Sequence, residues 1–248
     1  MKKYYTIDSE IVKDSLDCLS KNFPESIYLS GGMSAQFFLP KEYRRNSGDL
    51  DFDGPVKPTY SKFKETLKDL IEPCDIKTLN FKKSRYTYDG ILEYNEDSLS
   101  LQFPRRSLKS FDQHYESLNR ELENTIDCDY NNNKIKLINP NDLIIRKIRR
   151  SEIFKREYNI DKTEIPKNLN QEIQKINWLK ETFDIQDVNP KEAAYIVAEV
   201  RLIADIFDIK TLMTYYEDIN EKYIMNNLDS IPVYDKKSLN QFVKFIFD

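Results

Sequence analysis

The sequence has few of the residues that most often build metal centres and catalytic dyads. Its 248 residues include one histidine, three cysteines and five glycines. A single histidine excludes a multi-histidine metal site and leaves little room for a histidine-based triad. We expect His114 to have a structural or solvent-facing role in a polar helix. Any chemistry is therefore expected to depend on carboxylates, lysine, backbone amides and a metal ion.

The sequence also lacks the signatures of disulfide scaffolds, membrane proteins and polyanion binders. Cys18, Cys74 and Cys128 are widely spaced and form no Cys-x-x-Cys pair, a pattern that favours reduced thiols in a cytoplasm. No segment approaches the roughly 18 uninterrupted apolar residues of a membrane span. The net charge of −4 gives no global attraction to nucleic acid or anionic lipid. We expect a cytoplasmic protein that makes no membrane contact.

The residue pattern changes near Pro140, and this change predicts two regions. Residues 8–22, 59–73 and 111–124 have helical periodicity, whereas 26–30, 49–54, 75–103 and 133–139 contain the alternation or the β-formers typical of strands. Beyond Pro140, five segments in succession have helical periodicity, one of them at 168–184. We expect an α+β domain over residues 1–139, with a mixed sheet and flanking helices, followed by a helical domain over 140–248.

The segment DLDFDG, residues 49–54, has aspartates at alternate positions. Its first two aspartates, Asp49 and Asp51, are called the acidic ladder below. In a strand, alternate residues point to one face, so Asp49 and Asp51 would lie several Å apart on the same side. That spacing suits one hard divalent cation, which would also relieve the repulsion between the two carboxylates. In isolation, a ladder of this kind more often marks the solvent side of a strand.

A glycine pair lies shortly before the ladder, in the segment YLSGG. A strand that ends at Ser30-Gly31-Gly32 and opens into a short helix can turn backbone N–H groups towards a phosphate. An ordinary tight turn would use the same residues. A turn that can bind phosphate and an acidic ladder that can bind metal, within about 25 residues of each other, together indicate a nucleoside triphosphate site with Mg²⁺ or Mn²⁺.

At these residues the sequence resembles the DNA polymerase β-like nucleotidyltransferases, and it looks closest to their bacterial AbiEii-type branch. That branch has a glycine pair followed by an arginine, a hydroxyl residue and two aspartates that bind metal. The matching positions here are Gly31 and Gly32, Arg45 or Arg44, Ser47, Asp49 and Asp51. The resemblance implies that Ser30, Gly31, Gly32 and Ser47 bind nucleotide phosphates.

A second segment, residues 137–161, resembles the lysine-containing helix of the same family. The resemblance implies that Lys147, with Arg150, faces the nucleotide and that Asp161 is the later aspartate. In physical terms, a lysine there would offset charge on departing pyrophosphate, although the same residues also fit a basic helical surface.

Active members of the family that the sequence resembles usually have a third carboxylate on a neighbouring strand, which acts as a base or helps to hold a second metal ion. The sequence departs from the family at this position. The position that aligns with it is Gln102, which is neutral and cannot act as a base. Glu93 on the preceding strand is the alternative catalytic carboxylate, and Asp53 or Asp161 are further candidates.

The resemblance implies transfer of a nucleoside monophosphate from an NTP to RNA or tRNA, a protein or a small molecule, as in the toxin of a toxin–antitoxin or phage-defence pair. The alternative is a catalytically degenerate member that binds a nucleotide or a protein such as a cognate antitoxin.

Overall fold

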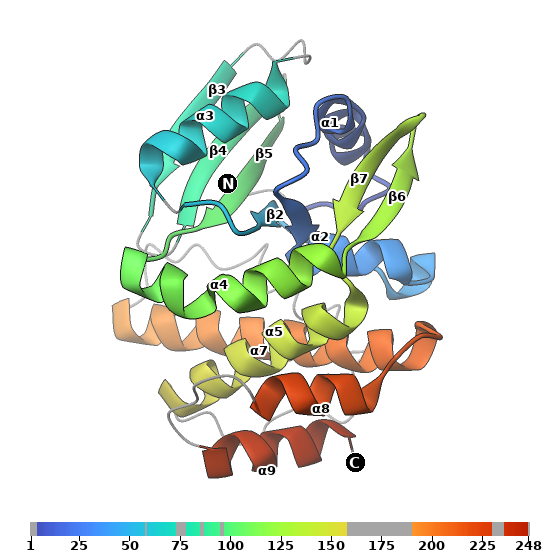
Figure 1. The fold of residues 1–248 in the computed structure, drawn as a ribbon, viewed down its shortest axis with the longest axis vertical. Helices are drawn as coiled ribbons and strands as arrows, with labels where there is room; N and C mark the ends of the chain where they lie inside the picture. Colours follow the sequence, from blue (N-terminus) through green and yellow to red (C-terminus); the bar gives the residue numbers. More distant parts are fainter. Residues whose placement is uncertain are drawn as a thin grey trace. The chain divides into compact units, whose positions relative to one another are not determined.

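The structure is a computed structural model that describes residues 4–57, 59–72, 78–84, 87–94, 97–157, 190–229 and 236–247 (Figure 1). The chain divides into two compact units. The first comprises residues 1–37 and 46–139, and the second comprises residues 38–45 and 140–248. Each unit is described separately below. The short segment 38–45 precedes the acidic ladder in sequence, but it packs with the helices of the second unit.

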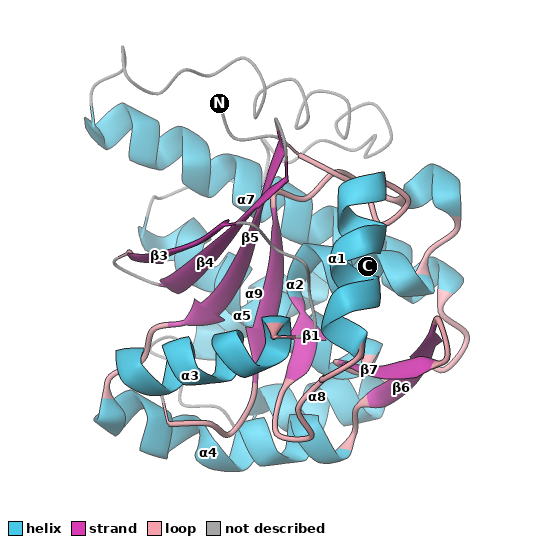
Figure 2. Cartoon of the chain, turned by 90° about the horizontal axis from the view of Figure 1, so that it is seen from above, coloured by secondary structure: helices cyan, strands magenta, loops and turns pink. Residues whose placement is uncertain are grey.

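The first unit is built on a seven-stranded mixed sheet in the order β3-β4-β5-β2-β1-β7-β6 (Figures 1 and 2). The strands are β1 (Tyr28–Ser30), β2 (Asp49–Asp53), β3 (Thr78–Lys83), β4 (Thr87–Tyr94), β5 (Asp97–Pro104), β6 (Ile126–Tyr130) and β7 (Asn133–Leu137). β2 pairs with β5 in parallel and with β1 antiparallel, so it is a central strand. The ladder therefore has a sheet neighbour on each side.

One face of this sheet forms the apolar core of the first unit. Leu50 and Phe52 of β2 are fully buried on that face, as the alternation in the sequence predicts. Helix α3 (Tyr60–Ile71) covers the face through Phe63, whose ring packs against Tyr88 of β4 and Phe103 of β5. Helix α1 (Glu10–Ser20) packs beside α3 and buries Leu16 and Leu19. Burial of these aromatic and aliphatic side chains fixes which face of β2 presents its carboxylates.

The opposite face of the sheet carries polar side chains along its central strands. Helix α4 (Leu108–Glu123) contacts this face at one end of β1, where the Tyr28 hydroxyl donates to Glu121 at 2.6 Å. The other end of β1 leads directly into the short helix α2 (Gly31–Ala35) and the 3₁₀ turn Gln36–Phe38. A further 3₁₀ turn, Lys41–Tyr43, belongs to the second unit.

In the second unit, α5 (Pro140–Glu157) packs against α7 (Pro190–Tyr215), α8 (Glu221–Asp229) and α9 (Lys236–Phe247). Its core includes Ile144, Ile148, Ile206, Phe207 and Phe242, all of which are almost completely buried. Among the described residues, no helix is both long enough and apolar enough to span a bilayer.

Several sequence-based expectations need correction or lie outside the described residues. The segment 126–130 forms β6, which we did not expect from the sequence; its Asp127 and Asp129 reduced the apolar signal of a strand that pairs with β7 along one edge only. Cys18 is disulfide-bonded, contrary to the expectation of reduced thiols, because cysteine spacing along a sequence does not show which sulfur atoms pair. Cys128 is a free thiol. The expected helix at 168–184 lies outside the described residues.

Candidate functional site

The acidic ladder forms as the sequence predicts. Asp49 and Asp51 are half-buried and lie on one face of β2, opposite Leu50 and Phe52. The hydroxyl of Ser47 donates to Asp49 Oδ1 at 3.3 Å. Ser47 is itself held by backbone hydrogen bonds in both directions with Tyr5. The contact gives Ser47 a role in orienting Asp49, whereas binding of a phosphate by Ser47 stays a prediction.

The glycine turn lies directly beside the ladder. Ser30, the last residue of β1, is the register partner of Asp51. Gly31 follows with a φ of 74°, in the left-handed region that side-chain-bearing residues avoid. A Cβ atom at residue 31 would overlap the carboxylate of Asp51. The turn therefore requires glycine for two reasons: the backbone conformation, and the space that the Asp51 side chain occupies.

This double requirement predicts the effect of Gly31→Ala. The added methyl group must displace the Asp51 carboxylate, and the left-handed backbone costs a further 1–2 kcal/mol or so. We expect Mn²⁺ binding to the folded protein to weaken by about tenfold or more, because a displaced ligand loses its alignment. Mn²⁺ affinity is measured by electron paramagnetic resonance, together with the thermal midpoint of unfolding.

Gly54→Ala is the matched control, because a Cβ atom there would overlap the backbone carbonyl of Ser26 and not the ladder. We expect Gly54→Ala to lower the thermal midpoint and to leave the Mn²⁺ affinity of the folded protein unchanged. Equal Mn²⁺ affinities for Gly31→Ala and the wild type would show that the turn does not position Asp51.

Gln102 lies at the position next to Asp51 on the neighbouring parallel strand. β2 and β5 pair with Asp49 opposite Ser100 and Asp51 opposite Gln102. Glu93 is exposed, lies on β4 opposite Ser98 and accepts a hydrogen bond from Asn80. Since β2 begins opposite Ser100, the structure does not bring Glu93 together with Asp49 and Asp51. Of Gln102 and Glu93, it is Gln102 that occupies the position beside Asp51.

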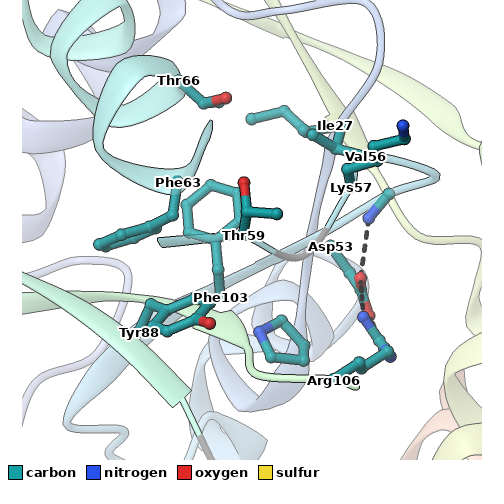
Figure 3. Close-up of a pocket in the computed structure, with 12 residues that line it drawn as sticks. Ile27, Asp53, Val56, Lys57, Thr59, Phe63, Thr66, Tyr88, Phe103 and Arg106 are labelled. Carbon is teal, nitrogen blue, oxygen red and sulfur yellow. Dashed lines mark hydrogen bonds and ion pairs between the residues drawn. The ribbon is translucent and has the colours of Figure 1, made fainter. Parts of the chain in front are cut away.

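Asp53, the third acidic residue of β2, is engaged in an ion pair. Its carboxylate is 2% exposed and bonded by both terminal nitrogens of Arg106, at 2.6 and 2.8 Å, and by the backbone amide of Gly54. The pair forms one wall of a small pocket that Phe63 and Phe103 also line (Figure 3). The pocket has a volume of about 30 Å³, which is enough for a water molecule but not for a nucleotide. Asp53 is thus part of a structural ion pair at the end of β2.

Lys147 lies within a buried ionic network in the second unit. Its side chain is 2% exposed, and its ammonium bonds Asp205 at 3.1 Å and Asp208 at 2.6 Å. Each of these carboxylates also accepts two hydrogen bonds from one arginine, Arg150 to Asp205 and Arg45 to Asp208. The charge of Lys147 is therefore balanced by two aspartates in this structure, an environment different from the nucleotide contact that the resemblance implies.

The ionisation of Asp205 and Asp208 depends on the cations that pair with them. Burial alone would raise the pKa of Asp205, but the charges of Arg150 and Lys147 outweigh burial, and the pKa is lowered well below its ordinary range. For Asp208, burial again opposes ionisation, and Arg45 and Lys147 together lower the pKa. Both carboxylates stay ionised because their cations are within hydrogen-bonding distance. The network ties α5 and α7 to the segment that ends at Arg45.

Sequence reasoning missed the buried pairing of Asp205 and Asp208 and the pairing of Arg106 with Asp53. Asp205 and Asp208 lie in the apolar run LIADIFDI at a spacing of three residues, which places them on one face of a helix. Charged residues within such a run are the signal of a buried ion pair, because isolated charges are rarely buried. Of the remaining predicted site residues, Arg150 is 45% exposed at its side chain and Asp161 lies outside the described residues. Phosphate binding by Arg150 stays a prediction.

Two of the three comparisons with known proteins found no match: no protein-family model and no curated protein matches the chain. Among solved structures, the chain is similar to an antigenic nucleotidyltransferase-like protein from Paracoccidioides brasiliensis. The sequences are 15% identical, the TM-score is 0.42, and the alignment covers 79% of this chain and 95% of the other.

Proposed function

We propose that the protein binds a nucleoside triphosphate with Mg²⁺ or Mn²⁺ at the ladder of β2 and transfers the nucleoside monophosphate to a polar acceptor. The observation that carries this proposal is the placement of Gly31 against Asp51. The fold uses a left-handed glycine to bring a backbone turn beside a pair of aspartates that share one face of a strand. Phosphate oxygens and a hard cation need these two kinds of group side by side.

The ligand chemistry of the ladder fits this cation. Mg²⁺ is typically held by one or two carboxylates, with substrate phosphates and water completing its coordination. Asp49 and Asp51 supply the two carboxylates, and the Ser47 hydroxyl restrains Asp49. When bound, the cation would neutralise charge on the triphosphate and on the departing pyrophosphate.

The remaining roles belong to the turn and to the acceptor. The amides of Gly31 and Gly32 and the hydroxyl of Ser30 bind the outer phosphates and orient the triphosphate. The acceptor oxygen or nitrogen forms a bond to the α-phosphorus, and the bond from this phosphorus to the bridging oxygen breaks, so pyrophosphate leaves with the electron pair. The acceptor proton passes to solvent, since the neutral amide of Gln102 cannot accept it. Positioning and charge therefore supply most of the rate enhancement.

Wild-type protein tests this proposal directly. We expect ATP or GTP to raise the thermal midpoint only when Mg²⁺ is present, because a ligand that binds only the folded state stabilises it, by about 2.7 kcal/mol at a hundred times its Kd. We also expect Mg²⁺-dependent release of pyrophosphate from NTP in the presence of total tRNA or cell extract. Absence of both stabilisation and pyrophosphate release would exclude a nucleotide site.

Gln102 favours a second candidate, a nucleotide-binding module that carries out no transfer. Gln102 and Ser100, the β5 residues opposite Asp51 and Asp49, offer the acceptor no carboxylate base. The two functions give different results in the same experiment. Mg²⁺-dependent stabilisation by NTP without pyrophosphate release, with every acceptor supplied, identifies the module, whereas release that requires an acceptor identifies the transferase.

A further inference from the structure

A row of polar residues crosses four neighbouring strands at the level of Asp51. Ser30 on β1 pairs with Asp51 on β2, which pairs with Gln102 on β5, and Gln102 pairs with Asp89 on β4. Register partners project from the same face of a sheet, with Cβ atoms about 4.5–5.5 Å apart in antiparallel pairs and comparably close in parallel ones. Gln102 is thus the β5 side chain that borders the ladder at Asp51.

Gln102 brings no charge to this position. Its amide nitrogen donates to the hydroxyl of Ser100 at 3.4 Å, and Ser100 is the register partner of Asp49. A neutral amide and a neutral hydroxyl therefore flank the two carboxylates on the β5 side. The β5 side therefore supplies no anionic oxygen that could hold a second divalent cation beside the one that Asp49 and Asp51 would hold.

The nearby carboxylates do not supplement the ladder. Asp53 is held by Arg106 and is 2% exposed. Asp89 lies two strands from Asp51, or about 10 Å at the usual strand spacing, and accepts a hydrogen bond from the Thr87 hydroxyl at 2.8 Å. Within the described part of the chain, no group of three or more acidic, histidine or cysteine side chains is arranged to hold a metal ion.

We propose that Gln102 restricts the site to a single divalent cation, held by Asp49 and Asp51, where a carboxylate at residue 102 would admit a second. This inference rests on the proposed function. It makes Gln102 the residue that sets the metal stoichiometry of the site. A single cation would neutralise charge on the triphosphate, and no second cation would be present to assist deprotonation of the acceptor.

Mn²⁺ counting by electron paramagnetic resonance, with a non-hydrolysable ATP analogue present, tests this inference without relying on activity. We expect one bound Mn²⁺ with an uncoupled signal in the wild type. Gln102→Glu is expected to bind two Mn²⁺ ions, and their signals should be coupled because paired metals in such sites lie about 3.5–4 Å apart. Two coupled Mn²⁺ ions in the wild type would overturn the inference, whether or not Gln102→Glu folds.

Two control variants separate charge from position. Gln102→Met keeps the size of the side chain and adds no ligand, so it should bind one Mn²⁺. Ser98→Glu adds the same charge on the same face of β5, but Ser98 is exposed and lies beyond the position opposite Asp49, so this variant should also bind one Mn²⁺.

One Mn²⁺ bound to a folded Gln102→Glu protein would also refute the inference. If Asp49→Asn and Asp51→Asn bind Mn²⁺ as the wild type does, the proposed function itself fails.

Discussion

Asp51→Asn is expected to lower the kcat/KM of NTP-dependent transfer by about 10²–10³-fold. The substitution keeps the shape of the side chain but removes one of the two negative charges that hold the cation, and groups that stabilise transition-state charge typically account for losses of this size. The carboxylate also borders the glycine turn, so its loss weakens the link between metal and phosphate binding. Pyrophosphate release at saturating and limiting NTP measures the loss.

The sheet contains a natural control for this experiment. β6 carries a second pair of alternate aspartates, Asp127 and Asp129, on an edge strand, and Asp127 forms exposed ion pairs with Lys134 and Lys136. These carboxylates have the same spacing as the ladder but no glycine turn beside them. We expect Asp127→Asn with Asp129→Asn to leave transfer unchanged. If this double variant and Asp51→Asn were equally active, the ladder of β2 would have no special role.

Asp208→Asn is expected to destabilise the folded protein by about 3–5 kcal/mol. The substitution leaves Arg45 and Lys147 almost completely buried with less compensating charge, and removing one partner from a buried ion pair typically costs this much. Urea unfolding followed by far-ultraviolet circular dichroism gives the free energy. Glu65→Gln breaks an exposed pair with Lys62 and is expected to cost no more than about 1 kcal/mol.

The pH dependence of stability is a second, independent test of the buried ionic network around Lys147. Asp205 and Asp208 have folded-state pKa values below their ordinary value, so their contribution is present above the unfolded pKa of about 3.9 and is lost as the pH falls through the folded values. Stability of the wild type should therefore fall steeply below about pH 4. Asp208→Asn should show a shallower fall, and identical acid profiles would contradict the assignment.

Local patterns predicted the parts of the site that lie close together in the sequence. The alternation in DLDFDG predicted the faces of β2, and the glycine pair predicted the turn after β1. The proximity of the two follows from the antiparallel pairing between β1 and β2, which are joined by residues 31–48. The alignment of Gln102 with Asp51 was anticipated from the resemblance, and the register between β2 and β5 provides its physical basis.

Contacts between residues far apart in the sequence could not be predicted from local patterns. Nothing near Lys147 in the sequence indicates that its ammonium meets residues 58 and 61 positions further along the chain. Helical periodicity indicates only that α5 has a buried face, and it does not identify which helix supplies the opposing charge. The same holds for Arg106, which reaches back 53 residues to Asp53, and for the disulfide at Cys18.

The sequence by itself determined the strand that presents Asp49 and Asp51 and the glycine turn that precedes it, and its change of residue pattern near Pro140 predicted two regions. These features depend on periodicity and backbone conformation within a few residues. Only the tertiary structure decided that Gly31 must lack a side chain because Asp51 occupies the space, that Gln102 borders the ladder while Glu93 does not, and that Lys147 is enclosed by two aspartates. The reason is physical: strand register and ion pairing are set by which distant segments bury their apolar surfaces together.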